Sequence, residues 1–220
     1  MRLRDDFSRH EVVRPGEEAW RPSPTPGVER IMLDRIGEEV ARATSIVRYA
    51  PNATFPRHVH GGGEEILVLE GLFTDESGQY PAGSYVRNPI GSAHAPAAGP
   101  QGATLFVKLH QFEPGDTRQL AIDTTGADWS PGPAPGMSIL PLHEFAQKRV
   151  ALQRWAPDTR FEPHRHPGGE EILVLEGTFH DEHGTYPCGT WLRSPPFSEH
   201  APFTGSEGAL IYLKLGHLPG

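Results

Sequence analysis

A block of sequence that occurs twice constrains this chain most. Residues 58–71 read His-Val-His-Gly-Gly-Gly-Glu-Glu-Ile-Leu-Val-Leu-Glu-Gly, and residues 164–177 read His-Arg-His-Pro-Gly-Gly-Glu-Glu-Ile-Leu-Val-Leu-Glu-Gly. The blocks lie 106 positions apart, and this register holds without a gap to the end of the chain. Upstream, residues 20–27 match residues 129–136 at an offset of 109 positions. This duplication predicts two domains of about 100 residues each.

The duplication also sets the expected domain limits. We predict an N-terminal arm at residues 1–19, a first domain at residues 20–115 and a second domain at residues 116–220. Pro114 and Gly115 stand where the first repeat ends, and such residues are typical of a linker. The arm is polar, and its sequence predicts no particular structure.

Short strands account for most of each repeat. The 25 glycines and 23 prolines among 220 residues, with 36% hydrophobic residues, favour many short elements joined by tight turns. The first repeat has strand-like runs at Glu65–Leu69 and Gly71–Thr74, and the second has their counterparts at Glu171–Leu175 and Gly177–His180. No long window carries the 3.6-residue apolar period of an amphipathic helix. The sequence therefore predicts an all-β fold, as sandwiches or barrels.

Each repeat contains two histidines, a carboxylate and a later third histidine at the same spacing. The candidate ligand sets are His58, His60, Glu64 and His94 in the first repeat and His164, His166, Glu170 and His200 in the second. Because side chains at i and i+2 of a strand point to one face, the paired histidines share a face, and the first glutamate keeps that parity. A bulge at residues 61–63 would instead favour Glu65, with Glu171 as its counterpart, so these two remain alternatives.

Three neutral imidazoles and one carboxylate suit a divalent transition ion such as Zn, Fe, Mn, Ni or Cu. Calcium and magnesium prefer oxygen ligands alone. Four protein ligands close a tetrahedral zinc site, whereas an ion that takes five or six ligands keeps positions for water, dioxygen or substrate. We therefore expect two ions per chain, one in each repeat, with Zn or Fe favoured, in either a structural or a catalytic role.

These residues resemble the two signatures of the cupin superfamily. The first, His-x-His-x3-Glu-x6-Gly, is met by residues 58–71 and by residues 164–177, and its count to the glycine favours the first glutamate of each pair. The second, Gly-x5-Pro-x-Gly-x2-His-x3-Asn, is met in part by residues 83–98 and 189–204, where the final Asn is missing. Phe197 replaces a glycine, so we expect the turn there to differ. The resemblance implies two tandem cupin domains, each a double-stranded β-helix or jelly-roll barrel that holds one metal.

Within that superfamily, the chain is most similar to the cupin domain of ChrR-type anti-sigma factors and to related acetylacetone and dihydroxyacetophenone dioxygenases. Gly-Gly-Glu-Glu-Ile-Leu-Val-Leu-Glu-Gly-x-Phe and Ser-x-x-His-Ala-Pro carry this resemblance, which covers residues 20–220. Anti-sigma factors of that type also have an N-terminal helical domain with a His-x3-Cys-x2-Cys zinc site. This chain has no cysteine before Cys188, so sigma-factor sequestration is not supported.

Three functions remain open at this stage. The first is a metal-dependent oxygenase that acts on a small oxygenated compound, such as a diketone or an aromatic ketone. The second is a ChrR-like ligand-sensing or regulatory module in which zinc is structural. The third is a structural or storage protein without turnover. No further acidic or basic residue recurs in both repeats at a position that indicates catalysis, so we assign no catalytic residues. The sequence is also compatible with a homo-oligomer.

Charge and hydropathy exclude other classes of partner. The net charge of −8 opposes a general role in nucleic-acid binding, and the longest basic run is Lys148-Arg149. Residues 1–10 have no apolar signal core, and no apolar stretch approaches the ~20 residues of a spanning helix. We therefore expect a cytoplasmic protein without membrane or nucleic-acid partners. Cys188, the single cysteine, allows no intrachain disulfide and is expected as a small buried packing residue.

Two further pairs of residues recur beside the signatures. For Arg87 and Arg193 we expect structural hydrogen bonding, with the anchoring of a ligand carboxylate as the alternative. Tyr85 and Trp191 are expected either in the barrel core or beside the metal, and strand parity does not separate these two positions.

Overall fold

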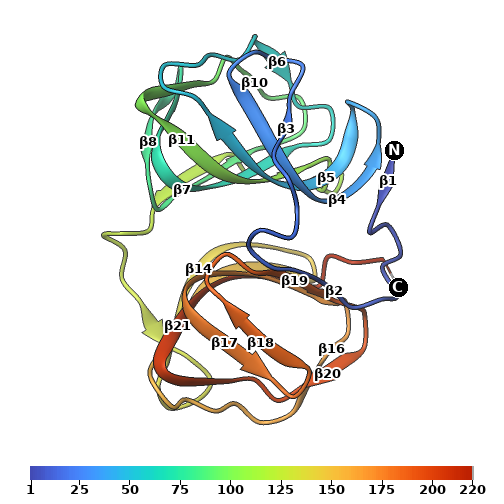
Figure 1. Cartoon of the computed structure of the whole chain (residues 1–220), viewed down its shortest axis with the longest axis vertical. Coiled ribbons are helices and arrows are strands. Elements are labelled where there is room, and N and C mark those ends of the chain that lie inside the picture. Colours follow the sequence, from blue (N-terminus) through green and yellow to red (C-terminus); the bar gives the residue numbers. More distant parts are fainter. Residues whose placement is uncertain (220) are drawn as a thin grey trace. The chain divides into compact units, whose positions relative to one another are not determined.

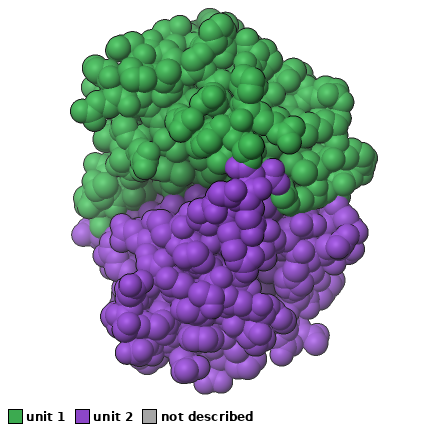
Figure 2. Space-filling model, viewed as in Figure 1, with its two compact units in different colours: residues 1–5, 19–127 green, residues 6–18, 128–220 purple. Residues whose placement is uncertain are grey.

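The computed structural model describes residues 1–219, and every regular element in that range is a β-strand. The strands form two compact units (Figure 1, Figure 2). Unit 1 contains residues 1–5 and 19–127, and unit 2 contains residues 6–18 and the chain from Asp128 onward. The all-β fold predicted from the sequence is confirmed. Residues 1–219 contain no helix that could cross a membrane.

Unit 1 is built on one antiparallel sheet with the strand order β1-β4-β5-β11-β7-β9-β12. Strands β3 and β8 pair with β4 and β7 at its margins, and β6 pairs with β10 as a separate ribbon. The bounds are β1 (Arg2–Leu3), β3 (Arg21–Pro22), β4 (Val28–Gly37), β5 (Ala41–Tyr49), β6 (His58–Val59), β7 (Glu64–Asp75), β8 (Gly78–Pro81), β9 (Ser84–Asn88), β10 (Ala93–His94), β11 (Ala97–Leu109) and β12 (Leu120–Asp123).

Unit 2 repeats this topology with the order β13-β14-β15-β21-β17-β19-β2. Strand β18 pairs with β17, and β16 pairs with β20 as the separate ribbon. The bounds are β2 (Glu11–Val13), β13 (Ser130–Pro131), β14 (Met137–Phe145), β15 (Lys148–Trp155), β16 (His164–His166), β17 (Glu170–Asp181), β18 (Gly184–Pro187), β19 (Trp191–Ser194), β20 (Ser198–His200) and β21 (Phe203–Leu215).

The two units exchange their first strands. Strand β2 precedes the first repeat in the chain but pairs with β19 of the second, where Glu11 lies opposite Arg193. Strand β12 precedes the second repeat but pairs with β9 of the first, where Leu120 lies opposite Arg87. Glu11 and Leu120 differ by the upstream offset of 109 positions, so the exchange is reciprocal and in the same register. The N-terminal arm and the linker therefore supply equivalent strands, and each unit takes its strand from the other repeat.

Side chains alternate along the strands between the apolar core of each unit and the opposite face of the sheet. On β7, Ile66 and Val68 belong to the apolar cluster of unit 1, and Ile172 and Val174 occupy the same place in unit 2. All four side chains are 1% exposed. Because neighbouring residues of a strand point to opposite faces, the intervening Leu67 lies on the other side of the sheet. This pattern matches the period-2 alternation that indicated strands in the sequence.

Two predicted strands merge in the structure. Glu65–Leu69 and Gly71–Thr74, which we expected as separate runs, form the single long strand β7. The pairing with β11 shifts register beside Gly71, whose φ is +74°. A Cβ at this position would lie 2.2 Å from the carbonyl oxygen of Gly102, so the bulge requires glycine here.

Two local expectations were wrong. The turn at Phe197 does not differ from its counterpart at Gly91: the two φ angles are +65° and +85°, and both amides donate to the second histidine carbonyl of their repeat. The hydrogen bonds of the turn thus hold Phe197 in a left-handed conformation that suits glycine better. Cys188 is exposed, not buried, because it lies in the turn between β18 and β19, with its Sγ 2.9 Å from the carbonyl oxygen of Leu175.

Candidate metal centres

The structure brings the four predicted ligands of each repeat together. In unit 1 they come from the β6–β10 ribbon, from His60 directly after β6 and from the start of β7. One ligand atom from each residue lies within 4.8 Å of all the others. The four ligands of unit 2 meet the same limit. In each set the first histidine is half-buried and the other three residues are buried. The sets are His58, His60, Glu64 and His94 in unit 1 and His164, His166, Glu170 and His200 in unit 2.

The two adjacent glutamates of each repeat point to opposite faces of the sheet, which decides between them as candidate ligands. Glu64 Oε2 lies 3.5 Å from His60 Nε2 and 3.3 Å from His94 Nε2. Glu65 is the next residue on β7 and points to the other face of the sheet, where it is 2% exposed. Its counterpart Glu171 is fully buried, accepts a hydrogen bond from Trp191 Nε1 at 2.8 Å and lies 2.8 Å from Nε2 of His217. The second glutamates therefore stabilise the buried side of each sheet rather than the ligand sets.

The nitrogen atoms that face each other in the two clusters have no hydrogen-bond partner. Nε2 of His60, His94, His166 and His200 is buried and unpaired, and so is Oε2 of Glu170. A buried polar atom without a partner is costly unless something outside the chain satisfies it. Imidazole nitrogens and carboxylate oxygens that converge in this way fit a divalent transition ion. The donor set thus passes the test of fitting a metal in both units.

The opposite ring nitrogens are held by hydrogen bonds. His58 Nδ1 lies 3.0 Å from the carbonyl oxygen of Pro56, and His164 Nδ1 lies 2.9 Å from that of Glu162. A carbonyl only accepts, so each Nδ1 carries the proton and donates. The lone pair of each ring is therefore on Nε2, which is the tautomer that a metal ligand needs.

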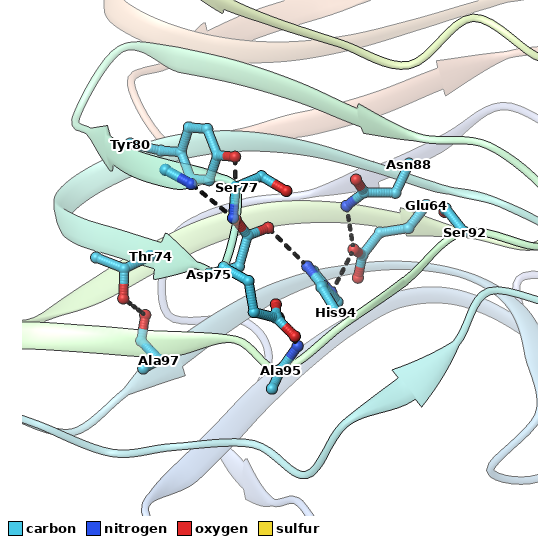
Figure 3. A network of polar contacts seen from close by, with 12 residues as sticks. Glu64, Thr74, Asp75, Ser77, Tyr80, Asn88, Ser92, His94, Ala95 and Ala97 are labelled. Carbon is cyan, nitrogen blue, oxygen red and sulfur yellow. Dashed lines mark hydrogen bonds and ion pairs between the residues drawn. The ribbon is translucent and has the colours of Figure 1, made fainter.

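Asp75 and Asp181 perform the same task for the third histidines, and the sequence did not predict this role for either residue. Asp75 Oδ2 lies 3.0 Å from His94 Nδ1, and Asp181 Oδ2 lies 3.2 Å from His200 Nδ1. Figure 3 shows Asp75 between His94 and the turn that follows β7. The available signal was the recurrence of Asp-Glu-x-Gly at the same place in both repeats.

The other oxygen of each aspartate is occupied by its own turn. Asp75 Oδ1 accepts from the amide nitrogens of Ser77 and Gly78 and from the hydroxyl of Tyr80, at 2.7, 3.1 and 3.1 Å. Asp181 Oδ1 accepts from the corresponding three donors of unit 2. Each carboxylate is thus fixed by its turn before it orients a histidine.

The two ligand glutamates differ in their surroundings. Asn88 Nδ2 donates to Glu64 Oε2 at 3.0 Å, whereas Ser194 stands at the equivalent position in unit 2. Burial alone would raise the pKa of Glu64, but its contacts with the neighbouring histidines and with Asn88 outweigh burial, and the pKa is lowered. Burial raises the pKa of Glu170 to about 7, because the charge of His200 opposes it only in part.

The pKa values of the buried histidines also depend on the balance between burial and neighbouring charges. Burial lowers the pKa of His60 and takes the pKa of His166 to about 3. Burial acts on His94 and His200 as well, but the carboxylates beside these rings outweigh it and raise both pKa values. The second histidine of each set is therefore neutral and ready to bind an ion, whereas the third is held by its carboxylates.

A cavity of about 470 Å³ adjoins the ligand set of unit 1. Its apolar wall includes Val47, Leu105 and Val107, and its polar groups include Arg30 and Arg35. Three of the four ligand residues line it, namely His58, His60 and Glu64. Tyr49 also lines this space. The arrangement offers an ion site open to a molecule of small size.

The interior of unit 2 carries larger side chains at matching positions. The pair Val28 and Tyr49 of unit 1 becomes Met137 and Trp155 in unit 2, in the same strand register. Both replacements are buried, and Trp155 packs edge-on against Phe179 at 5.3 Å between ring centroids. The two ion sites therefore have matching ligands but different walls.

The remaining recurrent pairs are structural. Arg87 forms an ion pair with Asp116 at 2.7 Å and stacks on Phe112, which agrees with the structural hydrogen bonding that we expected. Arg193 stacks on Phe7 and donates to the carbonyl oxygen of Asp6 at 3.2 Å. Tyr85 and Trp191 are fully buried on the face of Glu65 and Glu171, and neither lines the cavity. The set is Arg87, Arg193, Tyr85 and Trp191.

Comparison with known proteins agrees with this geometry. A family model described as the ChrR cupin-like domain matches the chain twice, at residues 8–113 and 117–219. Both matches begin before the exchanged strands, so each includes one of them. A search of curated proteins found no match.

Solved structures share the fold at low sequence identity. A candidate dioxygenase from Nostoc punctiforme is 17% identical, with a TM-score of 0.79 over 94% of this chain and 82% of its own. A candidate glyoxylate-induced protein from Pseudomonas aeruginosa is 15% identical, with a TM-score of 0.75 over 93% and 87%. A variant of Bacillus subtilis oxalate decarboxylase is 14% identical, with a TM-score of 0.64 over 93% and 76%. At these identities the likeness establishes the fold alone.

Proposed function

This chain belongs to the ChrR cupin-like family, and from that premise we propose that it is a metal-dependent dioxygenase acting on a small oxygenated compound in the cavity of unit 1. The substrate class is a diketone or an aromatic ketone, as the resemblance to acetylacetone and dihydroxyacetophenone dioxygenases implies. The observation that carries the proposal is the 470 Å³ cavity lined by three ligand residues. A purely structural ion has no need of such a space beside it.

His58, His60, Glu64 and His94 would hold the ion, with iron favoured in this role, and it would supply the Lewis-acid and redox chemistry that activates an enolisable ketone towards dioxygen. A dioxygenase inserts both oxygen atoms into the organic product as a carbon–carbon bond breaks, so no external reductant is needed. The protein's own contribution is orientation and exclusion of water. Val47, Leu105 and Val107 hold the apolar part of the substrate, and the histidine tautomers keep the Nε2 lone pairs directed at the ion.

The Tyr49 hydroxyl is the group that we assign to hold a substrate oxygen. It lines the cavity with the ligand residues, and burial raises its pKa further above its ordinary value, with the charge of Glu64 adding to the effect. The phenol therefore stays protonated and can donate a hydrogen bond to a ketone or enolate oxygen. Trp155 replaces it in unit 2, where the indole N–H donates to Gln153 at 3.1 Å instead.

For unit 2 we propose a structural ion, with zinc favoured. The larger side chains of Met137 and Trp155 beside the same ligand set support this assignment. The alternative for the whole protein is a ChrR-like sensing module in which both ions are zinc and a small molecule alters contact with a partner protein. An inert cupin with a storage role is the remaining candidate.

The test combines metal analysis with oxygen uptake. Wild-type protein should hold two ions per chain, and His58→Ala and His164→Ala should each lose one. Oxygen uptake on a panel of diketones and aromatic ketones should disappear in His58→Ala and persist in His164→Ala. Tight zinc in both units with no uptake and a co-purifying protein would favour the sensor. Absence of uptake after loading with iron, manganese or nickel would refute the dioxygenase.

A further inference from the structure

Two arginines line the cavity of unit 1. Arg30 and Arg35 lie on β4, and both belong to the wall that also includes the ligand histidines. Unlike most arginines, both are shielded from solvent: Arg35 is 3% exposed, and the side chain of Arg30 is 17% exposed. Arginines this far buried are normally paired with an anion.

Only one of these two charges is paired with a carboxylate. Arg30 Nη2 lies 3.0 Å from Oε1 of Glu39, and Nη1 lies 3.3 Å from Oε2. Arg35 Nη2 instead donates to the main-chain carbonyl oxygens of Glu38 and Glu39. These acceptors are neutral, and Nε and Nη1 of Arg35 have no acceptor within the described part of unit 1. Nη1 of Arg35 is therefore available to an anion as a single charged donor.

The charge balance of the cavity points the same way. Two guanidiniums face one carboxylate, Glu39, which is already held by Arg30. Glu64 belongs to the ion site, where a divalent cation would more than offset it. Burial lowers the pKa of Arg35, and repulsion from the charge of Arg30 lowers it further, whereas the charges of Glu39 and Glu38 act in the opposite direction. A ligand with one negative charge would relieve that repulsion.

The second unit provides an internal comparison. Arg30 pairs with Val47 across β4 and β5, and the corresponding pair in unit 2 is Ile139 with Gln153. Arg35 lies opposite Ala43, and Glu144 occupies the matching place opposite Arg149. The positive charge is thus particular to unit 1 and is not a requirement of the barrel.

We propose that the cavity of unit 1 binds a small organic carboxylate, with its carboxylate on Nη1 of Arg35, its short apolar body against Val47 and Val107, and a carbonyl or hydroxyl oxygen directed to the ion site. This assignment rests on the proposed function, because it names the substrate class of the same site. It narrows the diketones and ketones to those that carry a remote acid group.

Binding of a matched pair of ligands tests the proposal. The pair is 4,6-dioxoheptanoate, a β-diketone with a remote carboxylate, and its uncharged amide, which has nearly the same shape. Affinities are measured by isothermal titration calorimetry on the metal-loaded protein without oxygen. Wild-type protein should bind the acid at least tenfold more tightly than the amide. Equal affinities, or no binding of the acid, would overturn the proposal without the need for any variant.

Variants locate the effect. Arg35→Gln should lower affinity for the acid at least tenfold and leave affinity for the amide within twofold, and Arg35→Lys should restore part of the loss. Arg48→Gln is the control, because Arg48 is 47% exposed and pairs with Glu29 outside this cavity. A loss that is equal for acid and amide in Arg35→Gln would mean a structural role and would overturn the proposal.

The outcomes also separate this proposal from the proposed function. Binding of the acid through Arg35 without oxygen uptake would leave the carboxylate site standing and refute the dioxygenase. Oxygen uptake that is equally efficient on the acid and on its amide, and that is unchanged in Arg35→Gln, would leave the dioxygenase standing and overturn the carboxylate site.

Discussion

Replacement of Asp75 by Asn should weaken the ion site of unit 1 by changing the tautomer of His94. Asp75 accepts hydrogen bonds on both oxygens: Oδ2 from His94 Nδ1, and Oδ1 from the amides of Ser77 and Gly78 and the hydroxyl of Tyr80 (Figure 3). An amide side chain has only one oxygen. The three donors of the turn would hold that oxygen, so the NH2 group of the new residue would face His94.

His94 then has to accept rather than donate at Nδ1, which moves its proton to Nε2, the atom that faces the ion site. To restore the ligand tautomer, the amide must flip and give up three hydrogen bonds. At about 1 kcal/mol each, these bonds amount to about 3 kcal/mol. Since about 1.4 kcal/mol is a factor of ten, Asp75→Asn should bind the ion about 100-fold more weakly. This lies at the upper end of the effect of groups that orient metal ligands.

The assay is a competitive titration with Zn²⁺ or Co²⁺ against a chelator, in a His164→Ala background so that only unit 1 is measured. Removal of one turn donor in the double variant Asp75→Asn, Tyr80→Phe should recover about 1 kcal/mol, or roughly fivefold. Ser77→Ala keeps its backbone donor and should bind like the parent. Affinity of Asp75→Asn within threefold of the parent, or no recovery in the double variant, would refute the tautomer argument.

Two further predictions concern stability. Phe197→Gly should stabilise unit 2 by about 1 kcal/mol and raise its melting temperature by roughly 4 °C, because Phe197 has a φ of +65° and is 66% exposed. Gly91→Ala should destabilise unit 1 to a similar extent. Calorimetry measures both variants, and changes of the opposite sign would contradict the reasoning. In metal-free protein, burial raises the pKa of Glu170 from its ordinary value of 4.5 to about 7. The neutral form therefore stabilises the fold, fully below about pH 4.5, and this contribution is lost as pH rises through about 7. Glu170→Gln should therefore resist urea better than wild type at about pH 8 but not at pH 4, whereas Glu64→Gln should lose stability at pH 8, since the lowered pKa of Glu64 makes its ionised form the stabilising one.

The sequence predicted that His58, His60 and Glu64 would converge because strand parity is a local property. It predicted His94 from a different signal, the recurrence of a third histidine at the same distance in both repeats. Asp75 was missed because aspartate in an Asp-x-x-Gly turn has a sufficient local reason to be there. Its second role depends on His94, which lies 19 positions later and approaches only when β10 pairs with β6.

The exchange of first strands could not be predicted in the same way. Glu11–Val13 and Leu120–Asp123 share an offset but almost no identity, and a strand this short pairs equally well with many edges. Its actual partner, Trp191 opposite Val13, lies far away in the sequence. What selects that partner is tertiary: Phe7 covers Arg193 just before β2, as Phe112 covers Arg87 ahead of β12. The exchanged segment that contains β2, residues 6–18, belongs to unit 2 and ends directly before residue 19.

The two units differ in their walls and agree in their ligands because different strands carry the two features. The ligand sets and the aspartates that orient them come from β6, β7, β10 and the turn after β7, and from the matching elements of unit 2. The cavity wall that differs comes from β4 and β5, where Arg30, Arg35 and Tyr49 become Ile139, Glu144 and Trp155. Substitutions on β4 and β5 can therefore change the charge and volume of the cavity without touching any ligand or its hydrogen bonds. In this fold the charge and volume of the cavity are therefore physically separable from the residues that could hold an ion.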